Sequence, residues 1–352
     1  MFQRTQRPDH EGGKDGVFLR RNVSPSPCLI IDVLEMSKMR IFFACDVHGS
    51  ERSFFKFLNA GEFYKANVVI LGGDLTGKMI IPIVQSTDGT FEVDFIGTKQ
   101  TLKTPTELEE IEKRIRFSGY YPYRVSDDEF EDLQTDESKL HELFSKLMVE
   151  SLGRWVTLAD DRYERSGIKC FIMPGNDDRW VIDEVLAKAE HVDNPEGRLV
   201  RLDRDHEMIS LGWSNPTPWK SPRECSEEEL LRMIERMTSQ VEEMPNCVFN
   251  LHVPPYNSQI DTAQKIDDTL KPVYDAGQPV SIPVGSTSVR FAIEKYQPLL
   301  TLHGHIHEAR GACRIGRTLC MNPGSDYGQG ILKGVIVDLD ERRIKDYLLT
   351  SG

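Results

Sequence analysis

A chain of 352 residues can bury a large hydrophobic core, and it suits one large α/β domain or two smaller ones. Its formal net charge of -13 disfavours non-specific binding to nucleic acids, which needs a basic surface, but bound metal ions could still reverse the local charge at a site. The chain has no apolar run near the roughly 18 residues of a membrane span, so we expect no membrane segment and no secretory signal. Its seven cysteines are scattered without a C-x-x-C pair, so we expect a cytoplasmic protein without a disulfide framework.

The first 38 residues are polar and turn-rich, apart from a short apolar segment from Cys28 to Leu34. A regular strand pattern begins at Met39. We therefore expect an N-terminal extension, 1–38, ahead of a domain that spans 39–352. An accessory strand, a tail and an upstream start remain alternatives for the extension.

The first predicted strand runs from Ile41 to Cys45 and leads into Asp46-Val47-His48-Gly49. An Asp and a His two residues apart at a strand end can point to the same side of a loop. Oxygen and imidazole together suit zinc, iron or manganese. Taken alone, a helix-capping Asp beside a surface His is the simpler interpretation.

The second predicted strand is the β-branched run Val68 to Leu71, which is typical of a strand buried on both faces, and Gly72-Gly73-Asp74 follows it. A predicted helix, 53–58, lies between the two strands. The three elements form a β-α-β unit, whose ligands bind beyond the carboxyl ends of the parallel strands. An Asp after Gly-Gly often only caps a turn, so the metal-ligand interpretation depends on whether the pattern recurs.

The regular pattern is interrupted from residue 78 to about 167, where we expect an insertion that contains a hairpin and helices. It comprises strands 80–84 and 91–95 around a Ser-Thr-Asp-Gly turn, a helix from Thr106 to Phe117, a tyrosine-rich turn at 120–123, and a long acidic helical stretch over about 127–165. One interpretation is a cap over the site or a surface for a protein partner. The other is a solvated acidic helix that packs on the edge of the core.

Three more predicted strands end in residues that can bind metals. They are Cys170–Met173 before Pro174-Gly175-Asn176-Asp177-Asp178, Cys247–Leu251 before His252, and Pro298–Leu302 before His303-Gly304-His305-Ile306-His307. Taken alone, the first of these ends could be an ordinary turn, and the second could carry a structural histidine. Two histidines two residues apart, after four similar strand ends, favour a metal site.

The remaining pattern predicts a hairpin, two helices and three C-terminal strands. These are 199–202 with 208–211, the helices 226–237 and 289–296, and the strands 319–322, 334–338 and 344–349. The helix that begins near Ser226 carries a capping-box signature. In the loop after the hairpin, Trp213 and Trp219 either form the rim of a pocket or cover the core.

Taken together, Asp46-x-His48, Gly73-Asp74, Gly175-Asn176, His252 and Gly304-His305-Ile306-His307 resemble the motifs of the calcineurin-like metallophosphoesterases, in their small phosphodiesterase-like branch. The resemblance covers about 39–350. It implies an α/β fold, a four-layer α/β/β/α sandwich, into which the hairpin-plus-helices segment predicted above is inserted. It also implies two divalent metal ions at the strand ends, one held by Asp46, His48, Asp74 and His307, and the other by Asp74, Asn176, His252 and His305.

Such a centre explains the mixed ligand set. Two cations about 3.5–4 Å apart can share a carboxylate and lower the pKa of a bridging water, so that a hydroxide attacks phosphorus in line. We expect manganese, with iron or zinc as alternatives, and expect Asp74, Asn176, Asp177 and His252 to be catalytic. The expected reaction is hydrolysis of a small phosphodiester. The alternatives are a phosphomonoesterase or nucleotidase, a non-catalytic scaffold, and an enzyme whose insertion recruits a protein partner.

The chain departs from the family pattern at Asp177, where the commonest form has the His of Gly-Asn-His. An Asp close to two cations has a lowered pKa and is a poor proton donor at neutral pH. We therefore expect substrates with poor leaving groups to be disfavoured.

Overall fold

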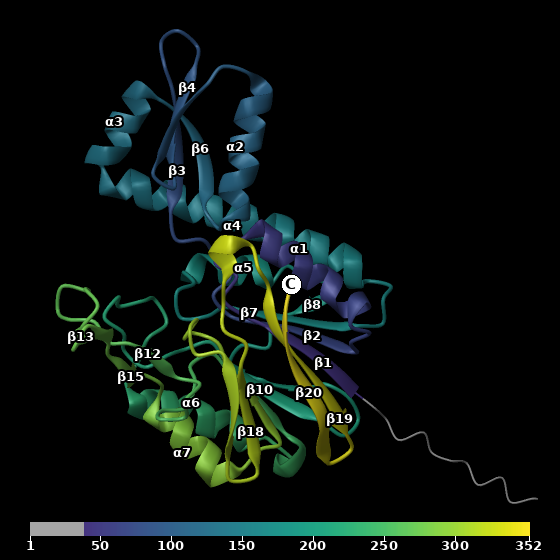
Figure 1. Ribbon diagram of the computed structural model, residues 1–352. Coiled ribbons are helices and arrows are strands. Elements are labelled where there is room, and N and C mark those ends of the chain that lie inside the picture. The colour runs from purple at the N-terminus through teal and green to yellow at the C-terminus, as the bar shows by residue number, and fades with distance from the viewer. Residues whose placement is uncertain (1–38) are drawn as a thin grey trace, which may run out of the picture. The chain divides into compact units, whose positions relative to one another are not determined.

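The computed structural model describes residues 39–352, so the predicted N-terminal extension lies outside the described residues. Its centre is a pair of six-stranded sheets (Figure 1). In the first sheet the strand order is β20 (Arg343–Ser351), β19 (Lys333–Asp340), β1 (Met39–Ala44), β2 (Val68–Gly72), β7 (Lys169–Met173) and β8 (Val192–Asp193). β1, β2, β7 and β8 are parallel, whereas β19 and β20 pair antiparallel at one side.

The second sheet also has a parallel centre. Its order is β17 (Gly311–Ile315), β18 (Thr318–Asn322), β16 (Leu300–Leu302), β11 (Val248–Leu251), β10 (Glu207–Leu211) and β9 (Leu199–Arg201). The four central strands are parallel, and each outermost strand pairs antiparallel with its neighbour. The hairpin expected before residue 211 is confirmed as β9 and β10.

Three hydrophobic clusters follow from the alternation of side chains along the strands. Phe42 faces helices α1 (Glu51–Phe63) and α4 (Glu137–Tyr163), whereas its neighbour Phe43 lies between the two sheets with Met208 and Leu300. On the far side, helices α6 (Glu227–Thr238) and α7 (Thr287–Tyr296) cover the second sheet (Figure 1). The predicted four-layer α/β/β/α sandwich is therefore confirmed.

Residues 80–126 form a third sheet with a hydrophobic cluster of its own. Its strands are β5 (Thr98–Leu102), β4 (Phe91–Phe95), β3 (Ile80–Gln85) and β6 (Tyr121–Ser126), and helices α2 (Pro105–Phe117) and α3 (Asp127–Thr135) accompany them. Ile83, Val93 and Ile111 are buried in its core. The predicted hairpin is confirmed as β3 and β4.

Two expectations for this region need correction. The tyrosine-rich stretch 120–123 is not a turn, because Tyr121 begins β6, which pairs parallel with β3. β6 is an edge strand, where Pro122 is tolerated because no further strand needs its missing N–H. The acidic stretch divides at Asp136, whose side chain accepts hydrogen bonds from the N–H groups of Ser138 and Lys139 and caps α4.

Several short elements were not predicted. They include strands β12 (Thr262–Gln264), β13 (Tyr274–Asp275), β14 (Gln278–Pro279) and β15 (Ser281–Pro283), helix α5 (Asp183–Leu186), and 3₁₀ helices at Trp180–Ile182, Met244–Asn246 and Tyr327–Gln329; strands β5, β8 and β17 were not predicted either. Strands of two or three residues are too short to show a period in the sequence. Within residues 39–352 no helix has both the length and the apolar composition needed to cross a membrane.

Helix α4 packs into the main core, although it lies in the predicted insertion. Trp155 is 2% exposed, and its ring stacks on Phe54 with centroids 4.3 Å apart and planes inclined by 6°. The indole N–H has no hydrogen-bond partner in the described residues. The second half of the predicted insertion therefore stabilises the sandwich itself.

This packing predicts that Trp155→Ala lowers the free energy of unfolding by about 3–5 kcal/mol, because it leaves a large cavity. Trp155→Phe should cost much less, since it keeps an aromatic ring and removes an unpaired buried N–H. Leu158→Ala is the matched control on the same helix: Leu158 is 42% exposed, and its loss should change stability by less than about 0.5 kcal/mol. Urea unfolding followed by circular dichroism measures all three. Equal losses for Trp155→Ala and Leu158→Ala would contradict the packing.

Candidate metal centre

The predicted site residues come together at the carboxyl ends of strands from both sheets. β1 leads to Asp46 and His48, β2 to Asp74, β7 to Asn176, β11 to His252, and β16 to His305 and His307. Backbone hydrogen bonds join the loops directly: Asp46 N donates to Gly73 O, His48 N to Asp74 O, and Gly304 N to His252 O. The seven side chains therefore meet where the two sheets approach each other.

One group of donor atoms comes from Asp46, His48, Asp74 and His307, and these atoms all lie within 4.8 Å of one another. His48 Nε2 lies 3.5 Å from Asp74 Oδ2 and 3.1 Å from His307 Nε2. His307 Nε2 lies 3.7 Å from Asp46 Oδ1. Two imidazole nitrogens that face each other beside two carboxylates form a donor set for a divalent cation.

A second group contains Asp74, His252 and His305. His252 Nε2 lies 3.5 Å from Asp74 Oδ1, the other oxygen of the same carboxylate. Asn176 Oδ1 joins this group, 3.1 Å from His252 Nε2 and 2.7 Å from His305 Nδ1. Asp74 is thus the member common to both groups, with one oxygen in each.

The proton on His252 has a defined place. Its Nδ1 lies 2.9 Å from the carbonyl oxygen of Gly72, so that Nδ1–H donates and the Nε2 lone pair faces the cluster. His303, in the same strand-end motif, is different: its Nδ1 lies 2.7 Å from Leu251 O and its Nε2 lies 2.8 Å from Thr301 Oγ1. His303 is therefore a structural residue, outside both groups.

The backbone of the site is held in an uncommon conformation. Asp46, His48, Asp74 and His305 have φ values of 53°, 39°, 53° and 66°, in the left-handed region. Such residues cost on the order of 1–3 kcal/mol each and persist only where their surroundings hold them. Here backbone N–H groups of other loops hold the two carboxylates. His305 N donates to Asp46, and Asp177 N donates to Asp74 Oδ1 at 3.0 Å.

The glycines in the motifs are required by close approach. A Cβ at Gly304 would lie 2.5 Å from Asp46 Oδ2, and a Cβ at Gly175 would lie 2.2 Å from Asp74 Oδ1. Either contact is closer than real side chains allow. Each glycine therefore precedes a site residue because the carboxylate of another strand end occupies the space beside it.

The charges of the cluster are interdependent. Burial raises the pKa of Asp74, while the neighbouring His252 opposes this rise. Burial favours a neutral His252, but Asp74 and Asp46 outweigh it and raise its pKa. A raised pKa means that His252 holds an additional proton when no metal is bound. A cation bound between these groups would displace that proton, as metal ions usually do when they bind histidine. Donor types, spacing and charge therefore all fit divalent metal ions.

Asp177, one of the four residues predicted to be catalytic, lies at the edge of the cluster and not inside it. Its Oδ2 lies 2.6 Å from Lys78 Nζ, and its Oδ1 accepts a hydrogen bond of 2.5 Å from the hydroxyl of Ser221. Burial opposes ionisation of Asp177, but Lys78, His48 and these hydrogen bonds lower its pKa to about 2. Neither Lys78 nor Ser221 was predicted, since no motif marks them in the sequence.

Asp178 was also missed, and it connects two strand-end loops. Its buried carboxylate accepts hydrogen bonds from the N–H groups of Leu75, Thr76 and Gly175 and from the Thr76 hydroxyl. The loop after β2 is thereby fixed to the loop after β7, and Asp74 to Asn176. The pair Asp177-Asp178 is the only signal in the sequence, and it does not show which of the two is structural.

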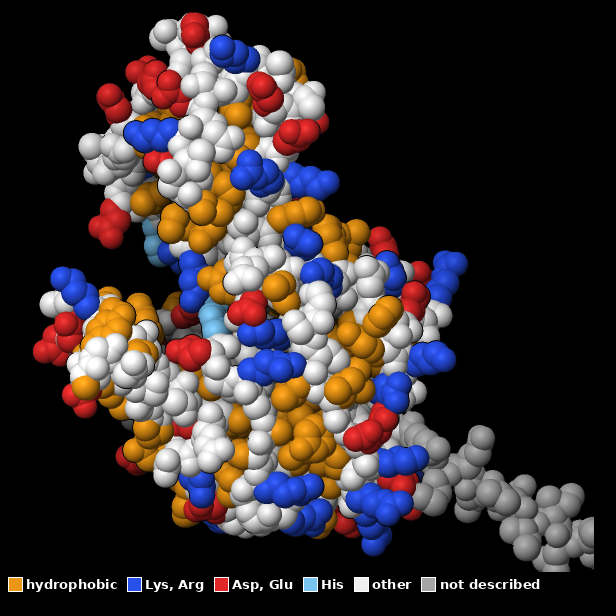
Figure 2. Space-filling view, in the orientation of Figure 1, with side chains coloured by type: hydrophobic (Ala, Val, Ile, Leu, Met, Phe, Trp, Pro, Cys, Tyr) orange, Lys and Arg blue, Asp and Glu red, His pale blue; other side chains and the backbone are white. Residues whose placement is uncertain are grey.

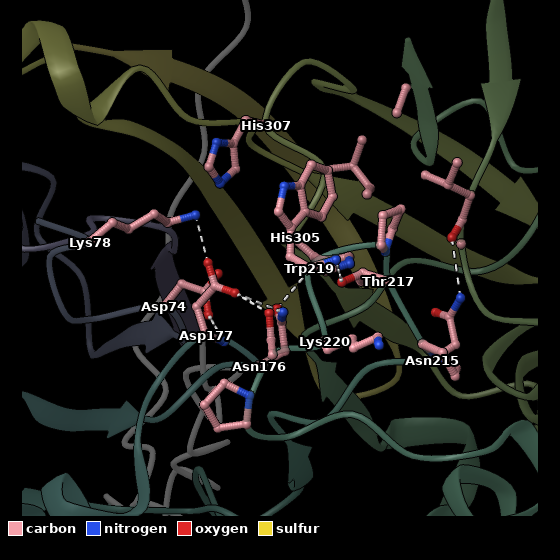
Figure 3. A pocket seen from close by; sticks show the side chains of 18 of the residues that line it. Asp74, Lys78, Asn176, Asp177, Asn215, Thr217, Trp219, Lys220, His305 and His307 are labelled. Carbon is pink, nitrogen blue, oxygen red and sulfur yellow. Dashed lines mark hydrogen bonds and ion pairs between the residues drawn. The ribbon is translucent and has the colours of Figure 1, made fainter. Parts of the chain in front are cut away.

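A cavity of about 1000 Å³ opens beside the cluster (Figures 2 and 3). Asp74, Asn176, His305 and His307 line it, together with Lys78 and Trp219. The two tryptophans of the 212–219 loop have different roles. Trp213 packs against the hydrophobic cluster between the second sheet and helices α6 and α7, whereas Trp219 is 67% exposed and lines the cavity.

No family model matches the chain. Protein MJ1162 of Methanocaldococcus jannaschii, described as uncharacterized, is 32% identical over 179 residues, which are 50% of this chain and 73% of MJ1162.

Among solved structures, one crystal structure matches with a TM-score of 0.54 at 12% identity over 89% of this chain and 99% of its own. The protein TT1561 of Thermus thermophilus matches with a TM-score of 0.49 at 13% identity, over 90% of this chain and 99% of its own. The phosphoesterase YfcE of E. coli matches with a TM-score of 0.29 at 12% identity, over 88% of this chain and 98% of its own. The chain belongs to the same family as MJ1162, and its four-layer α/β/β/α fold, with candidate metal-binding residues at the strand ends, is the fold that the resemblance to the calcineurin-like metallophosphoesterases implies.

Proposed function

We propose that the chain is a metal-dependent phosphohydrolase that acts on phosphodiesters through two divalent ions. The observation that carries the proposal is the position of Asp74, which has one carboxylate oxygen in each of two groups of donor atoms. Asp46, His48 and His307 would hold the first ion with Asp74, and Asn176, His252 and His305 the second. Mixed nitrogen and oxygen ligands suit manganese, with iron or zinc as alternatives.

When bound, such ions lower the pKa of a coordinated water and withdraw charge from phosphoryl oxygens. The chain's own residues prepare the site for this chemistry. Gly72 O fixes the tautomer of His252, and the N–H groups of His305 and Asp177 orient the two aspartates. Lys78 places an ammonium group at the mouth of the site, where it pairs with the Asp177 carboxylate.

The charge at this mouth favours diesters over monoesters. The Lys78 ammonium is paired with the ionised Asp177, so their charges largely cancel. A dianionic monoester would gain little there and would face the Asp177 carboxylate, whereas a diester carries a single negative charge. A phosphomonoesterase or nucleotidase is the alternative. A non-catalytic scaffold is disfavoured by the complete donor set.

The cysteines support a reducing compartment such as the cytoplasm. The six within the described residues are free thiols, and Cys45, Cys170, Cys247 and Cys320 are buried. The exposed inserted sheet is a candidate surface for a protein partner. Neither point affects the proposed chemistry.

The first prediction is that the purified protein, reconstituted with Mn²⁺ and freed of excess metal, carries two ions per chain. Asp74→Asn should lose more than one of them, because both groups share this carboxylate. His252→Ala should lose the second ion and abolish hydrolysis with an unchanged circular dichroism spectrum. Elemental analysis measures the ions, and Asp88→Asn, in the distant β3–β4 turn, is the control. One ion or none in the unmodified protein would refute the bridging role of Asp74.

The second prediction concerns the leaving group. Asp177 is ionised at neutral pH and cannot donate a proton, and nearby cations lower its pKa further. General acid catalysis typically contributes about 10²–10⁴-fold to the rate. Without a general acid, the rate should fall steeply as the leaving group becomes less acidic, so an aryl methyl phosphate should be cleaved much faster than a dialkyl phosphate. Asp177→His should improve the dialkyl ester selectively.

Asp177→Asn is the matched control for this substitution, since it removes the charge without supplying a proton donor. Rates across a series of leaving groups decide the matter. A rate that does not change with leaving-group pKa in the unmodified protein would show that another acid already protonates the leaving oxygen.

A further inference from the structure

The cavity is far larger than the phosphate group that the proposed centre would bind. Pockets of about 300–1,000 Å³ hold drug-sized molecules, and this one reaches the upper end of that range. It extends from Asp74 and His305 to residues 215–222 and to two short stretches near 263–266 and 282–287. Figure 3 shows Asp74, Asp177 and Lys78 on one side and Asn215 on the opposite side. Most of the space therefore lies away from the proposed metal ligands.

The walls of this space are mainly apolar. Ile266, Ile282 and Val284, from the segment that contains β12 and β15, line it and are partly exposed. Pro218 and Trp219 line it from the loop that follows β10, and Phe144 from α4. Hydrophobic side chains are visible on both sides of the hollow in Figure 2.

Two of the polar side chains on this side are already paired with protein. The Thr217 hydroxyl donates to Glu224 Oε1 at 2.5 Å, and the Asn215 amide donates to Val284 O at 3.4 Å. Asn215 Oδ1 is buried and has no partner among residues 39–352. A ligand in this space would therefore contact mainly the apolar side chains named above.

Cations lie in the same cavity. Arg179 and Lys220 line it, and Arg179 is anchored by a hydrogen bond of 3.1 Å to Ser145 Oγ and by its position over the Phe144 ring. An apolar space bordered by cations and continuous with a site for phosphate is complementary to a molecule with an anionic head and a hydrophobic body.

We infer that the cavity binds the hydrophobic part of the substrate, so that the substrate class is an amphiphilic phosphodiester with a bulky alkyl or aryl group on one ester oxygen. The identity of the head group rests on the proposed function. The hydrophobic site rests on the cavity walls alone. The two can therefore be tested separately.

The kinetic test compares 4-nitrophenyl methyl phosphate with 4-nitrophenyl hexyl phosphate, which share a leaving group and a charge. A fully buried methylene strengthens binding about fourfold, so five extra methylenes that are half buried give about 30-fold. The hexyl ester should show a KM lower by about this factor, with kcat nearly unchanged. Ile282→Ser and Trp219→Ser should each reduce the ratio of the two KM values severalfold.

Leu270→Ser is the matched control. Leu270 lies in the same segment as Ile282 and is 49% exposed, but it does not line the cavity, so the KM ratio should not change. A ratio that falls equally in all three variants, or in none of them, would show that the preference arises elsewhere and would overturn the inference.

The second measurement is calorimetry of hexylphosphonate and methylphosphonate binding to the Mn²⁺-reconstituted protein. The hexyl compound should bind about 30-fold more tightly, with a negative heat-capacity change from apolar burial. Preferential binding without hydrolysis of any diester would refute the proposed function and leave the hydrophobic site standing. Equal affinities for the two phosphonates would overturn the inference, whatever the hydrolysis assays show.

Discussion

The site depends on one buried carboxylate that must face two directions at once. Asp74 has Oδ2 toward His48 and Oδ1 toward His252, and it comes from the end of a strand at the centre of the first sheet. His252 and His305 come from the second sheet. Both sheets must therefore meet at their carboxyl ends, and the packing of Phe43 and Ile70 against Met208 and Leu300 brings them there.

Holding Asp74 in that position requires a supporting shell of backbone groups. The carboxylate receives the N–H of Asp177, and the residues after it are tied to Asp178. Several site residues have positive φ values, and glycines make room for neighbouring oxygens. Local strain of this kind is stable because the hydrogen bonds and the surrounding core fix the loops from several sides. The arrangement is thus preorganised by the protein.

Much of this could be read from the sequence because it repeats a local pattern. Each central strand is a run of apolar residues, and each ends in a glycine or a ligand-type side chain, so that Asp46, Asp74, Asn176 and His252 are visible in order. Asp178 could not be identified in the same way, since its partners at Leu75 and Thr76 are about a hundred residues away. The roles of Lys78 and Ser221 depend on the same long-range contact with Asp177.

The cavity walls escaped prediction for another physical reason. β12 and β15 have three residues each, and β13 and β14 have two, so none of them shows a period. β6 was mistaken for a turn because tyrosine and proline occur in turns, whereas its pairing with β3 is decided by the sheet that it joins. The two tryptophans of one loop separate into a core residue and a cavity residue, a distinction that only packing can make.

The separate core of the inserted sheet has a consequence for how unfolding is observed. The chain has four tryptophans, at 155, 180, 213 and 219, and all of them lie outside residues 80–126. Indole fluorescence therefore reports on the sandwich and its loops, while circular dichroism also records the inserted sheet with its helices. If the inserted sheet opens first, the two signals will follow different curves, and a single free energy of unfolding will describe neither. Coincident curves would mean that the small core of Ile83, Val93 and Ile111 is stable only while α4 remains docked beneath it.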